Sequence, residues 1–311
     1  MNYRQLGSTG IKVSEVGFGG WQLGNARDWE GMDDNQAIML VHEALDRGCN
    51  FFDTAPNYGG GKSESLLGEA LSGRRSEAVI NSKFGHHPDN TLDFDSQKIR
   101  SSVEGSLQRL KTDYLDSILL HNPPLEILTG KSDHFYILES LKQQGKIRAY
   151  GASVDSGYEM EELMKSTGSQ IIEVMFNIFH QEPRSAFTMA AEKNVGLIVK
   201  VPLDSGWLSG KYDENSVFTD IRSRWDQNQL RKRAELLPVL KEMLEPGESL
   251  VQLALRFILD YQEVSTVIPG NKKLEQLIEN LSASDKRIST EKVENLEVLW
   301  EKTLQANPLG W

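Results

Sequence analysis

The sequence predicts an α/β protein of the (β/α)8 (TIM) barrel class, with an N-terminal β-hairpin cap and an extra C-terminal helix. Short apolar runs rich in β-branched residues alternate along the 311-residue chain with longer amphipathic segments, as they do in successive βα units of a parallel sheet. There are eight such runs, and no Pro- or Ser-rich linker divides the chain. A doubly wound open sheet would also fit the alternation, but eight strands in one undivided chain favour a closed barrel.

The predicted elements follow in chain order. The eight strands are Val13–Gly19, Cys49–Phe52, Ala78–Asn81, Tyr114–Leu120, Ile147–Ala152, Ile171–Phe176, Val195–Val201 and Val264–Ile268. Helices are expected between them, for example at Asp34–Asp46, Gln97–Leu110 and Ser249–Leu259.

Three segments lie outside the repeat. Arg4–Lys12 is expected to form a hairpin, with Gly-Ser-Thr-Gly as its turn, that caps the barrel floor. Ser289–Leu304 is expected to add a C-terminal helix. Asp204–Gln229 is the longest stretch without a predicted element, and a loop of that length is usually functional. We therefore expect residues 1–311 to form a single barrel domain.

Composition and charge exclude several classes of protein. The formal net charge of -11 makes a nucleic-acid partner improbable. Cys49 is the only cysteine, which excludes an intramolecular disulfide and a thiolate zinc site. No secretory signal and no apolar stretch of roughly 20 residues is present, so we expect a cytoplasmic protein without membrane insertion. The six histidines form no metal-ligand pattern, and His86-His87 is expected to lie in a loop.

Polar residues follow five of the predicted strands. Asp53, Lys83 and His121 follow the second, third and fourth strands, and Ser153 and Asn177 follow the fifth and sixth. Parallel barrels build their active sites at the C-terminal ends of the strands, so these side chains should face one opening. Because buried charge is costly unless it is paired or used, an Asp, a Lys and a His on adjacent strands indicate a functional site.

Tyr58 is a candidate proton donor. It lies five residues after Asp53, so the intervening loop can return its phenol over the barrel opening. A lysine on the next strand could stabilise the phenolate, and Asp53 could hold that lysine charged. Asp53, Tyr58 and Lys83 together therefore predict general acid–base chemistry.

Three spaced motifs carry a resemblance to a known family. They are Gly-Cys-Asn-Phe-Phe-Asp-Thr-Ala-Pro-Asn-Tyr-Gly at 48–59 followed by Ser63-Glu64, Leu-Lys-Thr-Asp-Tyr-Leu-Asp-Ser-Ile-Leu-Leu-His at 110–121, and Ile-Pro-Gly-Asn-Lys-Lys-Leu-Glu-Gln-Leu-Ile-Glu-Asn at 268–280. With these motifs the chain resembles the aldo-keto reductases, in particular bacterial-type NADP-dependent members, over nearly its whole length. The resemblance implies NAD(P)H-dependent reduction of aldehydes or ketones, with Tyr58 as the general acid, Lys83 and Asp53 tuning its pKa, and His121 orienting the carbonyl.

The usual nucleotide fingerprints are absent, since Gln22 and Pro56 stand where those motifs need glycine. The resemblance instead implies a nicotinamide cofactor extended across the barrel opening, with Ser153 and Asn177 near the carboxamide, residues 202–211 over the pyrophosphate, and Glu279 and Asn280 at the adenine. The expected cofactor residues are Trp21, Ser153, Asn177, Pro202, Leu203, Ser205, Gly206, Leu208, Gly210, Lys211, Gly270, Asn271, Lys272, Lys273, Gln276, Glu279 and Asn280.

The choice between NADP and NAD rests on the last of these segments. Gly270 and Gln276 stand where NADP-specific members of the family commonly have basic residues. However, Lys272 and Lys273 lie at the expected start of a helix, where two ammonium groups and the helix N-terminus would favour a 2′-phosphate. We expect NADP, with NAD possible.

Two further departures concern the nicotinamide. A glutamine usual in the family is replaced by Glu173, and an aromatic residue that often stacks on the nicotinamide is replaced by Lys200. The resemblance therefore implies that this chain holds the face of the nicotinamide ring with other side chains than most members of the family.

The substrate is expected to be a small-molecule carbonyl compound or sugar. Trp21, Trp29 and Trp225 could wall its pocket, and the chain is expected to be a monomer or a weak homo-oligomer. One alternative is a module that binds the cofactor as a redox sensor for a protein partner. Another is an unrelated barrel isomerase or aldolase with Lys83 as a Schiff base, which Asp53 and Tyr58 make less favourable.

Overall fold

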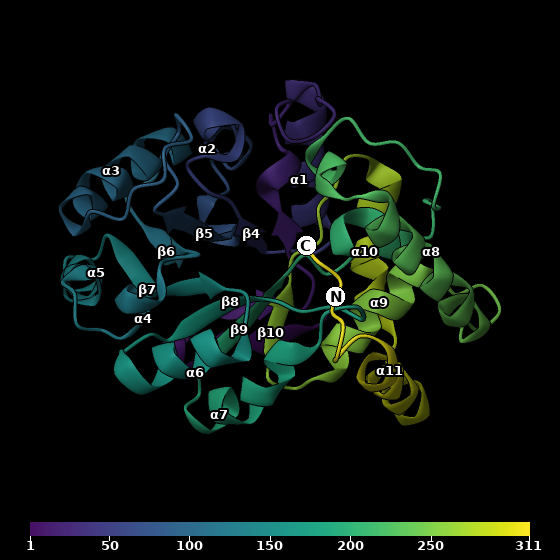
Figure 1. The fold of residues 1–311 in the computed structure, drawn as a ribbon. Helices are drawn as coiled ribbons and strands as arrows, with labels where there is room; N and C mark the ends of the chain where they lie inside the picture. Colours follow the sequence, from purple (N-terminus) through teal and green to yellow (C-terminus); the bar gives the residue numbers. More distant parts are fainter.

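The computed structural model describes residues 1–311 and contains one eight-stranded parallel sheet that curls into a barrel with the helices outside it (Figure 1). The strands follow one another around the barrel in chain order. They are β3 (Phe18–Gly19), β4 (Phe51–Asp53), β5 (Val79–Phe84), β6 (Leu115–His121), β7 (Ile147–Val154), β8 (Ile171–Met175), β9 (Gly196–Lys200) and β10 (Val264–Val267).

The first and last strands close the ring. Val16 bridges Val267 and Gly19 bridges Gly270, both in parallel. The backbone N–H of Gly17 donates to the carbonyl of Val267 at 2.8 Å. The predicted (β/α)8 barrel is therefore confirmed, and the open-sheet alternative is not the fold of this chain.

The helices bury apolar stripes against the outside of the strands, in one continuous core. They are α1 (Asp34–Asp46), α2 (Lys62–Ala70), α3 (Ile99–Leu110), α4 (Leu125–Leu128), α5 (His134–Gln143), α6 (Gly157–Ser166), α7 (Phe187–Glu192), α8 (Gln227–Glu242), α9 (Leu250–Asp260), α10 (Leu274–Ser282) and α11 (Thr290–Thr303). Local sequence sets several of their starts. Ser156 with Glu159 and Ser249 with Gln252 form capping boxes at α6 and α9. Ser289 caps α11, which is the predicted C-terminal helix.

The predicted hairpin is present as β1 (Tyr3–Gln5) and β2 (Lys12–Ser14), which pair antiparallel. It packs Leu6, Ile11 and Val13 against the lowest apolar layer inside the barrel. The predicted strand Val13–Gly19 is wrong as a single element, because its first residues belong to β2 and only Phe18–Gly19 is a barrel strand. The chain turns between them where Asn2 and Asn50 accept the backbone N–H groups of Glu15 and Ser14.

The segment Asp204–Gln229 is more ordered than the sequence predicts. It contains 3-10 turns at Asp204–Ser209 and Ile221–Arg224, and α8 begins at Gln227. The N–H of Ile221 donates to the carbonyl of Asp28 at 3.0 Å, which joins this segment to the loop after β3. None of the helices combines the length and the apolar character that a membrane span needs.

Candidate active site

Side chains inside the barrel change from apolar to polar toward the C-terminal ends of the strands. Phe51, Leu119, Ile171 and Ile198 belong to the apolar layer that packs on the hairpin. Since strand side chains alternate between the two faces, residues two positions further on point to the same interior. Those residues are Asp53, His121, Glu173 and Lys200.

This polar layer lies at one end of a cavity with a volume of about 580 Å³, a size typical of ligand sites. Asp53, Tyr58, His121, Glu173 and Lys200 all line it. From there the cavity extends past the β9–α8 loop to the start of α10. The cavity is therefore lined both by strand ends and by loops and a helix start far from them in sequence.

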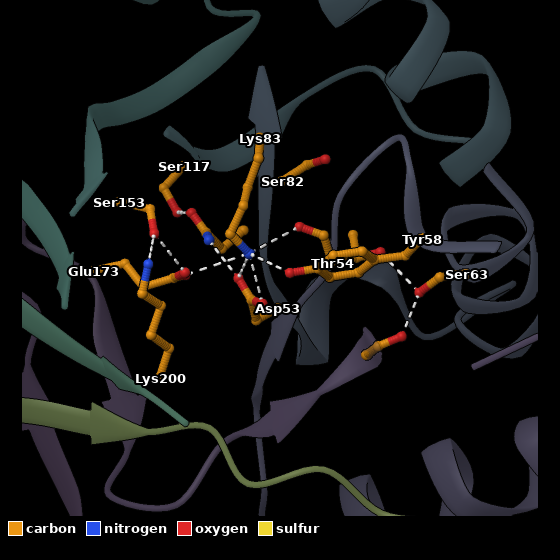
Figure 2. Close-up of polar contacts among 12 residues, drawn as sticks. Asp53, Thr54, Tyr58, Ser63, Ser82, Lys83, Ser117, Ser153, Glu173 and Lys200 are labelled. Carbon is orange, nitrogen blue, oxygen red and sulfur yellow. Dashed lines mark hydrogen bonds and ion pairs between the residues drawn. The ribbon is translucent and has the colours of Figure 1, made fainter. Parts of the chain in front are cut away.

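Lys83 lies at the centre of the polar cluster, completely buried (Figure 2). Its Nζ atom is 2.6 Å from both carboxylate oxygens of Asp53 and 3.2 Å from the carbonyl of Thr54. The same nitrogen is 3.5 Å from the Tyr58 hydroxyl and 3.3 Å from Glu173 Oε2. One ammonium group thus contacts two carboxylates and a phenol.

Charge and burial oppose each other in this cluster. Burial alone would lower the pKa of Lys83, but Asp53 and Glu173 outweigh it and raise that pKa, so the ammonium stays charged. Burial, with the Glu173 charge, raises the pKa of Asp53 above its ordinary value despite the contact with Lys83. Asn81 Nδ2 also donates to Asp53 Oδ1 at 2.7 Å, which fixes the orientation of the carboxylate.

Tyr58 reaches the cavity from the loop after β4. It begins a 3-10 turn continued by Gly59, Gly60 and Gly61, all with positive φ. A Cβ atom at Gly59 would lie 2.6 Å from the carbonyl of Gly24, so only glycine fits that turn. The tyrosine ring stacks on Trp21 at a centroid distance of 6.0 Å. Burial is the main cause that raises the pKa of the Tyr58 hydroxyl, so it is protonated at neutral pH.

His121 completes this end of the cavity. Its ring meets the Tyr58 ring edge-on, with centroids 6.0 Å apart, and lies 4.4 Å from the ring of His86. Burial, followed by the Lys83 charge, lowers the pKa of His121 well below its usual range, so the imidazole is neutral. A neutral imidazole beside a protonated phenol can orient a polar oxygen without adding charge.

On the other side of Lys83, Ser153 joins Glu173 to Lys200. Its hydroxyl lies 2.9 Å from Glu173 Oε1 and 2.8 Å from Lys200 Nζ (Figure 2). Lys200 Nζ also contacts Asn122 Oδ1 at 2.8 Å and Asp155 Oδ1 at 2.9 Å. The oppositely charged side chains of Glu173 and Lys200 therefore contact the same hydroxyl.

Most of the predicted site residues line the cavity. They are Asp53, Tyr58, His121, Trp21, Pro202, Leu203, Ser205, Gly206, Lys211, Gly270, Lys272, Lys273, Gln276, Glu279 and Asn280. Lys83, Ser153, Asn177, Leu208, Gly210 and Asn271 are not among the lining residues. Asn177 uses its amide within the protein, since Nδ2 donates to the carbonyl of Val201 and Oδ1 accepts from the N–H of Phe179.

The far end of the cavity combines a tight loop with the start of α10. Asp204, Ser205 and Gly206 all have positive φ. The backbone N–H groups of Asp204 and Gly206 donate to the carbonyls of Val201 and Leu203, which fixes this tight turn. Lys273 is the N-cap of α10, and Lys272 Nζ lies 3.4 Å from Glu30 Oε2. The expected helix start at these lysines is therefore present.

Sequence reasoning missed several residues of the wall. They include Gln22, His86, Arg222 and Trp311. Arg222 and Trp311 lie far from the strand ends in sequence, whereas His86 lies two residues after the end of β5 and could have been found there. The expectation that Trp225 lines the pocket is wrong, because its ring packs on Trp207 inside the core. Trp21 and Trp29 do form part of the wall, edge to face.

Unsatisfied polar groups indicate that the cavity suits a large polar ligand. Gln22 Oε1, Asn57 Oδ1 and His121 Nδ1 are buried on its wall without a hydrogen-bond partner. Gly270 is packed so closely on Gln22 that a Cβ atom would lie 2.3 Å from Gln22 Oε1. With lysines at one end and a phenol–ammonium pair at the other, these residues fit a large polar ligand such as a dinucleotide.

Comparison with known proteins agrees with this geometry. Residues 15–301 match the model of the aldo/keto reductase family. The chain is 31% identical over 310 residues to the uncharacterized oxidoreductase YqkF of Bacillus subtilis, covering 98% of this chain and 97% of that protein. It is also 31% identical to the NADH-specific methylglyoxal reductase of Escherichia coli, covering 91% and 94%.

A solved structure shows the same fold. The holo form of aldo-keto reductase AKR11C1 from Bacillus halodurans superposes with a TM-score of 0.82 at 29% identity, covering 96% of each chain. The match of the family model to nearly the whole chain shows that this protein is a member of the aldo/keto reductase family of oxidoreductases.

Proposed function

We propose that this protein reduces aldehydes or ketones to alcohols with a nicotinamide dinucleotide, preferably NADP, and that Tyr58 is the general acid. The observation that carries the proposal is the contact between the Tyr58 hydroxyl and Lys83 Nζ, at 3.5 Å, on the wall of a large cavity. Aldo-keto reductases act on small-molecule carbonyl compounds, and the two tryptophans beside Tyr58 offer an apolar wall for such a substrate.

The chain's own groups would handle the proton. A bound nicotinamide supplies the hydride. Tyr58 donates its proton to the carbonyl oxygen as negative charge develops there. Lys83, held charged by Asp53, stabilises the phenolate that this leaves. Neutral His121 positions the oxygen next to the phenol. Each residue thus has a role that its surroundings in the structure permit.

The choice of cofactor is proposed from this chain's own residues. The Escherichia coli relative is named as specific for NADH, so family membership does not decide the question. Lys272 and Lys273 line the far end of the cavity at the start of α10, where a 2′-phosphate would be favoured. Because Lys272 also faces Glu30, we expect a moderate preference for NADP.

The test combines cofactor binding with turnover. NADPH fluorescence titration should show saturable binding, and a panel of carbonyls that includes methylglyoxal, an aliphatic aldehyde and an aldose should identify a substrate. Tyr58→Phe should lower kcat by about 10²–10⁴-fold with NADPH affinity nearly unchanged, since the phenol supplies a proton and not affinity for the dinucleotide. Tyr150→Phe, which removes the hydroxyl of another buried tyrosine, is the matched control. Near wild-type turnover in Tyr58→Phe would exclude Tyr58 as the acid.

A further inference from the structure

Glu173 is a second carboxylate within reach of the ammonium of Lys83. It lies on β8 and is only 2% exposed, with Oε2 at 3.3 Å from Lys83 Nζ. Asp53 contacts the same nitrogen at 2.6 Å from another strand. The cluster therefore holds two carboxylates and one ammonium around a single phenol.

The position of Glu173 is fixed by the barrel. In the parallel register, His121 on β6 lies beside Ser153 on β7, which in turn lies beside Glu173. Glu173 shares the interior face with Ile171, two residues before it. Ser153 donates to Glu173 Oε1 at 2.9 Å, which leaves Oε2 toward Lys83 and the cavity.

We propose that Glu173 is a positioning residue that acts as a second counter-ion of Lys83 and thereby keeps the proton on Tyr58 as the pH rises. This inference rests on the proposed role of Tyr58 as the acid. Both the Tyr58 hydroxyl and Glu173 Oε2 lie within 3.5 Å of the same nitrogen, so the carboxylate offsets the charge that would stabilise a phenolate.

The other charged groups near Tyr58 do not replace this effect. With Asp53 as its only counter-ion, Lys83 would form a neutral ion pair. Glu173 adds a second negative charge, so the cluster of these three side chains is net negative. Burial lowers the pKa of His86 and of His121, so both rings are neutral. Asp28 lies on the cavity wall and accepts a hydrogen bond from Trp21 Nε1. The ring of Trp21 in turn packs on Tyr58.

Two ion pairs lie further out. Lys200 reaches Glu173 only through the Ser153 hydroxyl and is itself paired with Asp155 at 2.9 Å. Glu64 and Arg109 neutralise each other at 2.6 Å behind Ser63. The pKa of Tyr58 agrees with this balance, since burial raises it most and the Asp53 and Glu173 charges raise it further against Lys83.

The consequence concerns the direction of the reaction. Carbonyl reduction needs the protonated phenol, and alcohol oxidation needs the phenolate. A second carboxylate therefore extends reduction toward alkaline pH and delays oxidation to a higher pH. A glutamine in place of Glu173 would leave Lys83 with one counter-ion. The alkaline limit of carbonyl reduction and the pH at which alcohol oxidation begins would then both move to lower pH.

The experiment is the pH profile of kcat/KM for carbonyl reduction in Glu173→Gln. This substitution keeps the size of the side chain and an acceptor for Ser153 but removes the charge. The alkaline limit should move to lower pH by on the order of one unit, and the rise of alcohol oxidation should move with it. Glu15→Gln is the matched control, because Glu15 is equally buried but pairs with Arg4 and Arg287 beside the hairpin, and its limit should not move.

A second variant tests the sign of the effect. Lys200→Met removes the positive charge that faces Glu173 across Ser153, so the alkaline limit should move upward. This variant also carries the test if Glu173→Gln does not fold. An unmoved limit in Glu173→Gln, or a downward move in Lys200→Met, overturns the inference while Tyr58-dependent turnover still supports the proposed function. Absence of Tyr58-dependent turnover overturns the function itself.

Discussion

Replacing Lys83 with methionine should destabilise the protein by an amount that depends on pH. Methionine has a similar volume but leaves Asp53 and Glu173 buried without a cation. Removing one partner of a buried ion pair costs about 3–5 kcal/mol, because the remaining charge stays desolvated. That loss should dominate any gain from the apolar side chain, since Lys83 Nζ makes both of its 2.6 Å contacts with one carboxylate.

The sign of the pH dependence follows from the two carboxylates. Without the ammonium, burial holds the folded-state pKa of Asp53 above its unfolded value of about 4. Protonated carboxyl groups tolerate burial, so their contribution to stability is fully present below pH 4 and is lost as the pH rises through the raised folded value. The free energy of unfolding of Lys83→Met should therefore fall increasingly below that of the wild type between pH 5 and pH 8.

Urea unfolding at several pH values measures this difference. Lys98→Met is the matched control, because Lys98 forms a comparable ion pair with Asp93 at an exposed position. The control should lose much less stability, and its deficit should not grow between pH 5 and pH 8. An equal deficit at both pH values in Lys83→Met would refute the view that Lys83 neutralises two buried carboxylates.

Two further predictions concern the far end of the cavity. Replacing Lys272 and Lys273 together with alanine should weaken NADPH binding by roughly tenfold with little effect on NADH, and added salt should reduce the loss of NADPH affinity. A fluorescence titration measures both dissociation constants. If both change by the same factor, these lysines do not recognise the 2′-phosphate. Trp311→Ala should accelerate dissociation of NADPH in stopped-flow measurements, because Trp311 Nε1 donates to Ser205 Oγ at 3.2 Å on the cavity wall. An unchanged dissociation rate would show that the Trp311 ring does not cover the cofactor.

The sequence predicted the barrel, and it predicted that Asp53, Lys83 and His121 lie together at one end of it, because both depend on local pattern. Strand periodicity places Asp53 and His121 at the ends of apolar runs, and the parallel register brings such ends together. The break between β2 and β3 was missed. Ser14 and Glu15 do interrupt the apolar run, but the turn itself depends on Asn2 and Asn50 from elsewhere in the chain.

The rest of the site depends on long-range contacts. Arg222 comes from a segment without strand or helix periodicity, and it reaches the cavity because the neighbouring Ile221 pairs with Asp28. In the view of Figure 1 the C-terminus appears between the labels β4 and α10, and Trp311 lines the cavity. Glu173 did carry a local signal, since it shares the interior face with Ile171, but only the structure shows that it contacts Lys83.

The opposite charges of Glu173 and Lys200 should be tested together, because both lie within 2.9 Å of the Ser153 hydroxyl. Removing either charge alone changes the net charge near Tyr58, whereas removing both restores it. The double variant Glu173→Gln with Lys200→Met should therefore have an alkaline limit for carbonyl reduction between those of the two single variants. Its position should be nearer to that of Glu173→Gln, because Glu173 contacts Lys83 directly and Lys200 acts through Ser153. A limit below that of Glu173→Gln would show that Lys200 does not offset Glu173, and the two charges would then act on Tyr58 independently.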